Sequence, residues 1–290
     1  MNRVTVPRLV VDAHVHMWKA SSADRPWMPG TKPQLPEPFT IERVVPMLDE
    51  AGVERVVIVP PSLEGERLDY AQEAVRRYPG RFAIMGRIAL NDPTNSRRLP
   101  TWREQLGVLG IRLNIAGEQA AWLSDGTADW FWPAAEAAGI PVTFLTTGHT
   151  HRFAAIAERH PDLILIIDHM GVSSECVRSH EVPTAIDQSV ALAKFPNVSV
   201  KLSAAPLMSA ERYPFRDVDL HIRRLFDAYG PRRCYWGTDV TNSFAKATYR
   251  ERVTHFTEAL DFLSEEDKDW IMGRAIVERL GWRAPEVIPN

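Results

Sequence analysis

The feature that most limits the fold of this chain is a regular alternation of apolar runs with segments of helical periodicity. Eight runs are rich in Val, Ile and Leu, and several are apolar almost throughout, as in strands that are covered on both faces. We expect these strands at residues 9–16, 53–60, 82–88, 108–114, 141–147, 163–169, 198–203 and 234–239. Helices are expected at residues 40–51, 68–78, 129–138, 152–160, 186–195, 219–229, 248–263 and 265–280.

Eight strand–helix units predict an α/β protein folded as a (β/α)₈ TIM barrel, in a single domain over residues 1–290. A doubly wound sheet is the structural alternative, but it would normally have fewer strands. A dinucleotide-binding sheet would also carry G-x-G-x-x-G after the first strand, and the sequence has no such glycine run. The long stretches 17–39, 116–127 and 171–184 follow strands, where a barrel builds its substrate pocket.

Composition narrows the class of protein. A hydrophobic content of 45% and a charged content of 24% are typical of a soluble globular chain, and a net charge of -3 gives no basic field for nucleic acid. No apolar run approaches the ~20 residues of a membrane span, and residues 1–8 lack the apolar core of a signal peptide. The two cysteines form no C-x-x-C motif, which favours a reducing cytoplasm. We therefore expect a cytoplasmic protein with a small-molecule substrate; assembly into a homo-oligomer is left open.

Ionisable residues stand at the ends of three of the expected strands. The first run ends in His14-Val15-His16, and alternation along a strand places Asp12, His14 and His16 on one face. The sixth run ends at Asp168-His169 and the eighth at Asp239. Each residue alone has an ordinary explanation, because a strand-end histidine often bonds to backbone and an aspartate often caps a turn. In a barrel, however, His14, His16, His169 and Asp239 would meet at one mouth and share one divalent cation.

These motifs resemble those of the amidohydrolase superfamily, and more narrowly amidohydrolase family 2. The resemblance rests on ordered motifs at residues 12–18, 110–114, 168–171, 200–203 and 236–239, which read DAHVHMW, GIRLN, DHMG, VKLS and WGTD. That branch includes lactonases acting on pyrone-dicarboxylate and decarboxylases of the aminocarboxymuconate type. The motifs at 168–171 and 201–203 are more similar to those of the lactonases.

Two departures from the family pattern bear on the metal and the substrate. Members with a well-formed metal site often carry a histidine at the end of strand five, where this chain has Thr146-Thr147, with His149 and His151 following. The pyrone-dicarboxylate lactonases also lack that histidine and work without a metal. We expect one divalent ion, zinc or alternatively manganese, with a metal-free site as the other possibility. The pyrone-dicarboxylate enzymes also place an arginine near the segment 204–208, which has none here; we therefore expect a monoanionic or neutral substrate.

The function expected from this resemblance is hydrolysis of a lactone or similar cyclic ester. Asp239 would act as general base on a water, while His169 and its neighbours or a metal polarise the carbonyl. Four further residues are expected to contact substrate: Arg112, Lys201, Arg87 and Trp18. For Arg112 and Arg87 the alternative is a salt bridge inside the barrel, for Lys201 pairing with Asp12 or Asp168, and for Trp18 simple packing.

Two other functions fit the same residues. One is a metal-dependent decarboxylase of a small unsaturated or aromatic carboxylic acid, which would release carbon dioxide. The other is a catalytically silent barrel that only binds a small acid, and it would tolerate Asp239→Asn.

Overall fold

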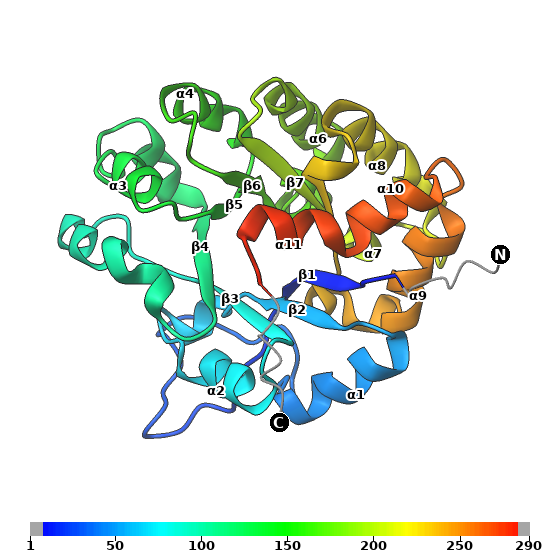
Figure 1. The fold of residues 1–290 in the computed structure, drawn as a ribbon, viewed down its shortest axis with the longest axis horizontal. Helices are drawn as coiled ribbons and strands as arrows, with labels where there is room; N and C mark the ends of the chain where they lie inside the picture. The colour runs from blue at the N-terminus through cyan, green and yellow to red at the C-terminus, as the bar shows by residue number, and fades with distance from the viewer. Residues whose placement is uncertain (1–7, 284–290) are drawn as a thin grey trace.

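Eight parallel strands, paired in the order β1 to β8, form the barrel of the computed structural model, which describes residues 8–283 (Figure 1). The strands are β1 (Val11–Val15), β2 (Arg55–Ile58), β3 (Phe82–Gly86), β4 (Val108–Ile115), β5 (Val142–Thr146), β6 (Leu165–Ile167), β7 (Val198–Ser203) and β8 (Cys234–Gly237). The backbone N–H of Asp239 donates to the carbonyl of His14 over 2.9 Å, which joins the end of β8 to β1. The predicted TIM barrel is confirmed. Residues 1–7 and 284–290 lie outside the described part, and the expectation about a signal peptide at residues 1–8 therefore stays a prediction.

Helices cover the outside of the strands, close to the positions that the sequence predicts. They are α1 (Ile41–Ala51), α2 (Asp69–Arg77), α3 (Phe131–Ala137), α4 (Phe153–Arg159), α5 (Ser174–Arg178), α6 (Val182–Ala191), α7 (Ala205–Met208), α8 (Arg216–Tyr229), α9 (Tyr249–Thr254), α10 (Glu265–Asp269) and α11 (Ala275–Leu280). The expected helix 248–263 changes to a π-helix at His255–Ala259, and 265–280 is divided by a π-helix at Trp270–Arg274. Between β3 and β4 the chain forms 3₁₀ turns at Pro93–Glu104, where Pro100 removes a helical donor.

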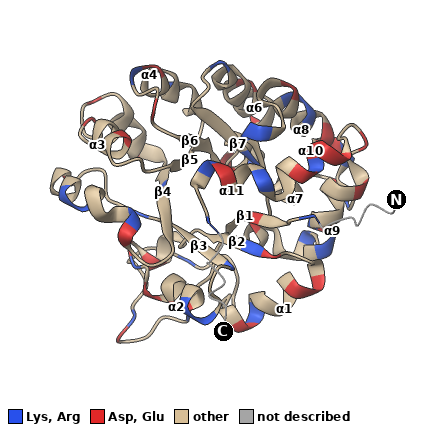
Figure 2. Ribbon diagram, viewed as in Figure 1, with Lys and Arg blue, Asp and Glu red and all other residues tan. Residues whose placement is uncertain are grey.

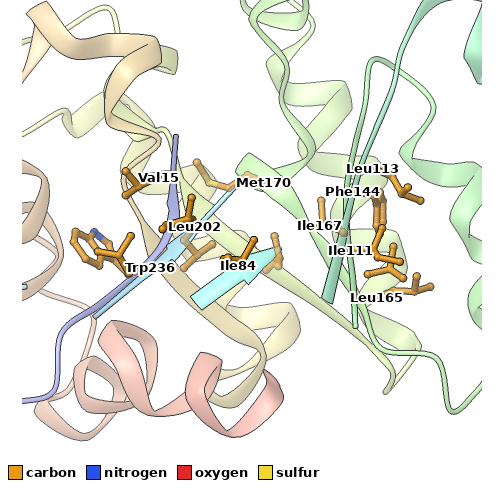
Figure 3. Packing of buried hydrophobic residues seen from close by; sticks show 14 of the residues in the cluster. Val15, Ile84, Ile111, Leu113, Phe144, Leu165, Ile167, Met170, Leu202 and Trp236 are labelled. Carbon is orange, nitrogen blue, oxygen red and sulfur yellow. The ribbon is translucent and has the colours of Figure 1, made fainter. Parts of the chain in front are cut away.

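Alternating strand residues build two apolar layers. Outward-facing side chains such as Ile84, Phe144 and Leu202 pack between strands and helices (Figure 3). Inward-facing side chains from the first part of several strands, such as Val57 and Tyr235, form a second cluster with residues of the Trp270–Leu280 segment. In Figure 1, α11 lies in front of the strands, and it covers this end of the barrel.

The inward positions nearer the strand ends are charged instead of apolar. Arg112 on β4, Asp168 after β6 and Lys201 on β7 are all buried there. Most other charged residues of both signs lie on the outer helices and loops (Figure 2). Within residues 8–283, no helix has the length and apolar character needed to cross a membrane.

Candidate active site

Four side chains from three strand ends meet at the mouth of the barrel. The Nε2 atoms of His14 and His16 lie 3.3 Å apart, and His16 Nε2 lies 3.4 Å from Asp239 Oδ1. His169 Nε2 lies 3.6 Å from the other oxygen, Asp239 Oδ2. All four side chains are almost completely buried. The structure therefore brings together the residues that the sequence places at one mouth.

The backbone at these strand ends has an uncommon conformation. His169, Met170, Ala204 and Asp239 all have positive φ, between 46° and 63°, although none is glycine. Left-handed backbone costs a non-glycine residue of the order of 1–2 kcal/mol, and such residues concentrate at functional sites. The turn after β8 thereby directs the carboxylate of Asp239 toward the histidines.

Each histidine ring has its second nitrogen held by a neighbour. His16 Nδ1–H donates to the carbonyl of Val59 over 2.6 Å, and His169 Nδ1 lies 2.8 Å from Ser203 Oγ. Burial lowers the pKa of all three imidazoles, to about 4 for His16. They are therefore neutral at pH 7, which is the state required of a metal ligand.

The proton on His14 has two possible positions. Lys201 Nζ lies 3.4 Å from His14 Nδ1, so the lysine can donate there while His14 Nε2–H donates to His16 Nε2. His14 Nδ1 also lies 3.6 Å from Asp168 Oδ1, and a proton on Nδ1 would leave Nε2 free as a ligand. The same arrangement thus supports a metal-free and a metal-binding state.

Asp12 does not point at the site, which corrects the expected shared face. Its carboxylate accepts hydrogen bonds from the backbone N–H of Thr238, over 2.9 Å, and from the hydroxyl groups of Thr238 and Tyr249. The pairing of β1 with β2 shifts register between Asp12 and Val15, and this irregularity interrupts the two-residue alternation. Asp12 therefore joins the first strand to the last, and only His14 and His16 reach the mouth.

A buried ion-pair cluster lies directly beneath the histidines. Asp168 Oδ1 is 3.0 Å from Lys201 Nζ, and Asp168 Oδ2 accepts a hydrogen bond from Arg112 Nε over 3.2 Å. Burial alone would raise the pKa of Asp168, but Lys201, His14 and Arg112 hold it well below its usual range. The carboxylate is ionised and balances the charge of Lys201, which is fully buried, and part of the charge of Arg112.

A cavity of about 150 Å³ opens above this cluster. His16, His169 and Asp239 line it together with Arg87 and Arg112. Its other lining residues come from strand ends and from the segments that follow them: Gln34, Pro61, Ser62, Asn114, Leu145, Val172, Ser173, Ser174, Leu207 and Asn242. The cavity has room for a small polar molecule.

Two groups of side chains have the composition of a metal site: His14 with His16 and Asp239, and His14 with Asp168 and His169. The second group is already neutralised, because Lys201 and Arg112 bind Asp168. In the first, Asp239 Oδ1 is buried and has no hydrogen-bond donor among the described residues. Tetrahedral zinc with bonds of about 2.0–2.2 Å separates neighbouring ligand atoms by roughly 3.3–3.6 Å, similar to the distances found here. The first group fits a divalent cation.

A family model described as Amidohydrolase matches residues 11–278. The chain belongs to the amidohydrolase family. This amidohydrolase is 27% identical over 239 residues to the L-fucono-1,5-lactonase of Burkholderia ambifaria, with 79% of each chain covered. It is 28% identical over 252 residues to the 4-sulfomuconolactone hydrolase of Hydrogenophaga intermedia, with 83% of this chain and 77% of that one covered. An amidohydrolase from Burkholderia multivorans, solved with bound zinc, has the same fold, with a TM-score of 0.77 at 21% identity over 94% of this chain and 99% of the other.

The residues expected to touch substrate in this amidohydrolase divide into two groups. Arg112 and Arg87 line the cavity. Lys201 lies below it in an ion pair with Asp168, one of the two pairings given above as the alternative for this lysine. Trp18 is fully buried, packs against Phe39 with ring centroids 6.1 Å apart, and is not among the residues that line the cavity. Its position agrees with the alternative of simple packing.

Strand five contributes no imidazole to the cluster. Thr146 is buried and its hydroxyl lies 3.2 Å from that of Thr150. His149 and His151 follow it, and neither belongs to the two groups that could hold an ion.

Sequence reasoning gave several residues of the site no role in its chemistry. Asp168 was named only as a possible partner of Lys201, and its place beside His169 in the DHMG motif was the available signal for a position in the site. Ser203, which bonds His169, was likewise visible only as the last residue of a strand. Gln34 and Asn242 come from loops, where the sequence carried no signal for the direction of a side chain.

Proposed function

We propose that this amidohydrolase hydrolyses a lactone or similar cyclic ester, with Asp239 as the general base. The observation that carries the proposal is the buried, unpartnered Asp239 Oδ1 at the edge of a small polar cavity. The two relatives are both named for hydrolysis of lactones, which supports the substrate class.

The neighbours of Asp239 suit it to the role of base. Asn242 Nδ2 donates to Asp239 Oδ2 over 2.6 Å, which fixes the carboxylate and leaves Oδ1 for a water molecule. The oxygen of that water attacks the lactone carbonyl as its proton passes to Asp239. The ring C–O bond then breaks, and the same proton is delivered to the ring oxygen, which gives the hydroxy acid.

The oxyanion that forms during attack needs stabilisation by groups already in place. We propose that His14, His16 and Asp239, with His169 beside them, hold one divalent cation, with zinc as the first choice and manganese as the alternative. Such a cation would polarise the carbonyl and lower the pKa of a bound water. In a metal-free enzyme, His169, which lines the cavity, would donate a hydrogen bond to the oxyanion itself.

The test measures turnover of a panel of five- and six-membered lactones by the protons that hydrolysis releases. Asp239→Asn keeps the size of the side chain but cannot accept a proton, so the rate should fall by about 10²–10⁴-fold. Asp227→Asn, an exposed aspartate on α8, is the matched control and should keep full activity. Near-normal turnover by Asp239→Asn would remove this residue from the mechanism.

Two further measurements separate the alternative functions. Release of carbon dioxide from a carboxylic acid would identify a decarboxylase instead of a hydrolase. Tight binding of a small acid, without turnover of any lactone, would identify a binding protein.

A cytoplasmic location stays a prediction, and it agrees with two buried, unpaired cysteines, Cys176 and Cys234. Assembly into a homo-oligomer also stays open.

A further inference from the structure

Arg87, directly after β3, is a partly buried cation without a paired anion. Within residues 8–283, no carboxylate lies within ion-pair distance of its guanidinium, and its hydrogen bond is a long one of 3.5 Å to the carbonyl of Pro60. The acidic groups near it are engaged elsewhere. Asp168 binds Lys201 and Arg112, and Glu66 binds Arg98 and the backbone N–H of Ala89.

A second guanidinium stands beside it. Burial, and then the nearby charge of Arg112, lower the pKa of Arg87 to about 9, so it remains protonated at pH 7 beside a like charge. Arg112 uses Nε for Asp168, and neither of its Nη atoms has a hydrogen-bond partner among residues 8–283. Two adjacent guanidinium groups with free N–H donors are costly to bury unless an anion accepts from them.

Both arginines stand at the boundary between two cavities. The first is the cavity that contains Asp239 and the histidines. The second, also of about 150 Å³, lies between the ends of β3 and β4 and includes apolar side chains such as Ile88, Leu90 and Trp122. Arg87, Arg112 and Asn114 line both. A ligand ring near Asp239 could therefore place a substituent between the arginines and still have room beyond them.

We infer that Arg87 and Arg112 form a carboxylate site, and that the substrate is a lactone with a single carboxylate bound between them. The inference rests on the proposed lactone hydrolysis and names the substrate class for it. The lining of the two cavities gives the number: among the described residues, Arg87 and Arg112 are the only Lys or Arg side chains that line either one. One substrate carboxylate accepts from both, whereas a second would be bound without a cationic partner.

The experiment compares two lactones that differ by the carboxylate, 5-oxotetrahydrofuran-2-carboxylate and γ-butyrolactone. Arg87→Met keeps the apolar length of the side chain but removes its charge. It should raise KM for the carboxylated lactone by about 10- to 100-fold, the range of a hydrogen bond to a charged group, and change KM for the neutral lactone much less. Arg87→Lys should recover part of the loss. Arg223→Met, an exposed arginine on α8, is the matched control.

A binding measurement separates this inference from the proposed reaction. Tetrahydrofuran-2-carboxylate has no carbonyl to hydrolyse, and calorimetry should show that Arg87→Met weakens its binding by a similar factor. Loss of this binding in a protein that hydrolyses no lactone would support the carboxylate site and refute lactone hydrolysis. Turnover without preference for the carboxylated lactone, or equal losses for both lactones in Arg87→Met, would overturn the carboxylate site and leave lactone hydrolysis standing.

Discussion

Replacing Asp168 by Asn removes the negative charge at the centre of the barrel and leaves Lys201 and Arg112 buried without compensation. Asn has nearly the same shape, so the variant tests charge and not packing. Breaking a buried ion pair from one side typically costs 3–5 kcal/mol, and two cations depend on this carboxylate, so we expect a loss of about 4 kcal/mol in the free energy of unfolding. This is a large part of the roughly 5–15 kcal/mol that stabilises a typical domain.

Lys201→Met is the informative partner to that variant. It removes one cation, but Asp168 keeps its hydrogen bond from Arg112 Nε, so the expected loss is smaller, about 1–3 kcal/mol. In the double variant neither the lysine nor its carboxylate is charged. The combined loss should therefore be clearly smaller than the sum of the single losses, as for residues that are coupled.

Urea denaturation followed by far-UV circular dichroism measures all three variants against the unchanged chain. The midpoint and slope of each transition give the free energies. A loss below about 1 kcal/mol for Asp168→Asn would refute the reasoning, because it would mean that the two cations are solvated or paired elsewhere. Strict additivity in the double variant would likewise show that Lys201 and Asp168 do not act as a pair.

Three further predictions follow from the site and the sheet. Exhaustive chelation should abolish lactone turnover, added zinc should restore it, and His14→Ala should prevent this recovery. Full activity in a protein that contains no metal by elemental analysis would instead show that the enzyme is metal-free. Arg112→Met should raise KM more than it lowers kcat, because the arginine holds the ground state, and steady-state kinetics that show the reverse would contradict this. Gly110→Ala should lower the free energy of unfolding by about 2–4 kcal/mol, because the new Cβ would lie 2.3 Å from the carbonyl oxygen of Pro141. An unchanged midpoint of urea denaturation would show that β4 and β5 can move apart to make room for the methyl group.

The barrel was predictable because its signals are local. An apolar run in the sequence corresponds to a strand in the structure, and the ionisable residue that ends the run lies at the end of the strand, as at His14, His169 and Asp239. Chain order then places all strand ends on one face, since consecutive parallel strands of a barrel are neighbours.

The details of the site depend on contacts that no local pattern contains. The direction of Asp12 follows from a register shift between β1 and β2. The choice of Asp168 over Asp12 as the partner of Lys201 depends on how β7 packs beside the turn after β6. The left-handed backbone at His169, Met170 and Asp239 contradicts the ordinary preference of these residue types, and only the surrounding fold sustains it. The sequence indicated Arg87 as a substrate-binding candidate. It could not show that, within residues 8–283, the guanidinium has a long hydrogen bond to a carbonyl and no carboxylate partner.

The hydrogen bonds of Asp12 have a consequence for which pieces of this chain can fold by themselves. Asp12 is 226 residues from Thr238 and 237 residues from Tyr249, yet its carboxylate connects both to the first strand. A fragment without the residues from Thr238 onward keeps His14 and His16, but its Asp12 carboxylate loses the donors that Thr238 and Tyr249 supply. Leaving a buried acceptor without its donors is destabilising. The first and last strands therefore depend on each other, and we do not expect the barrel to divide into two separately stable halves.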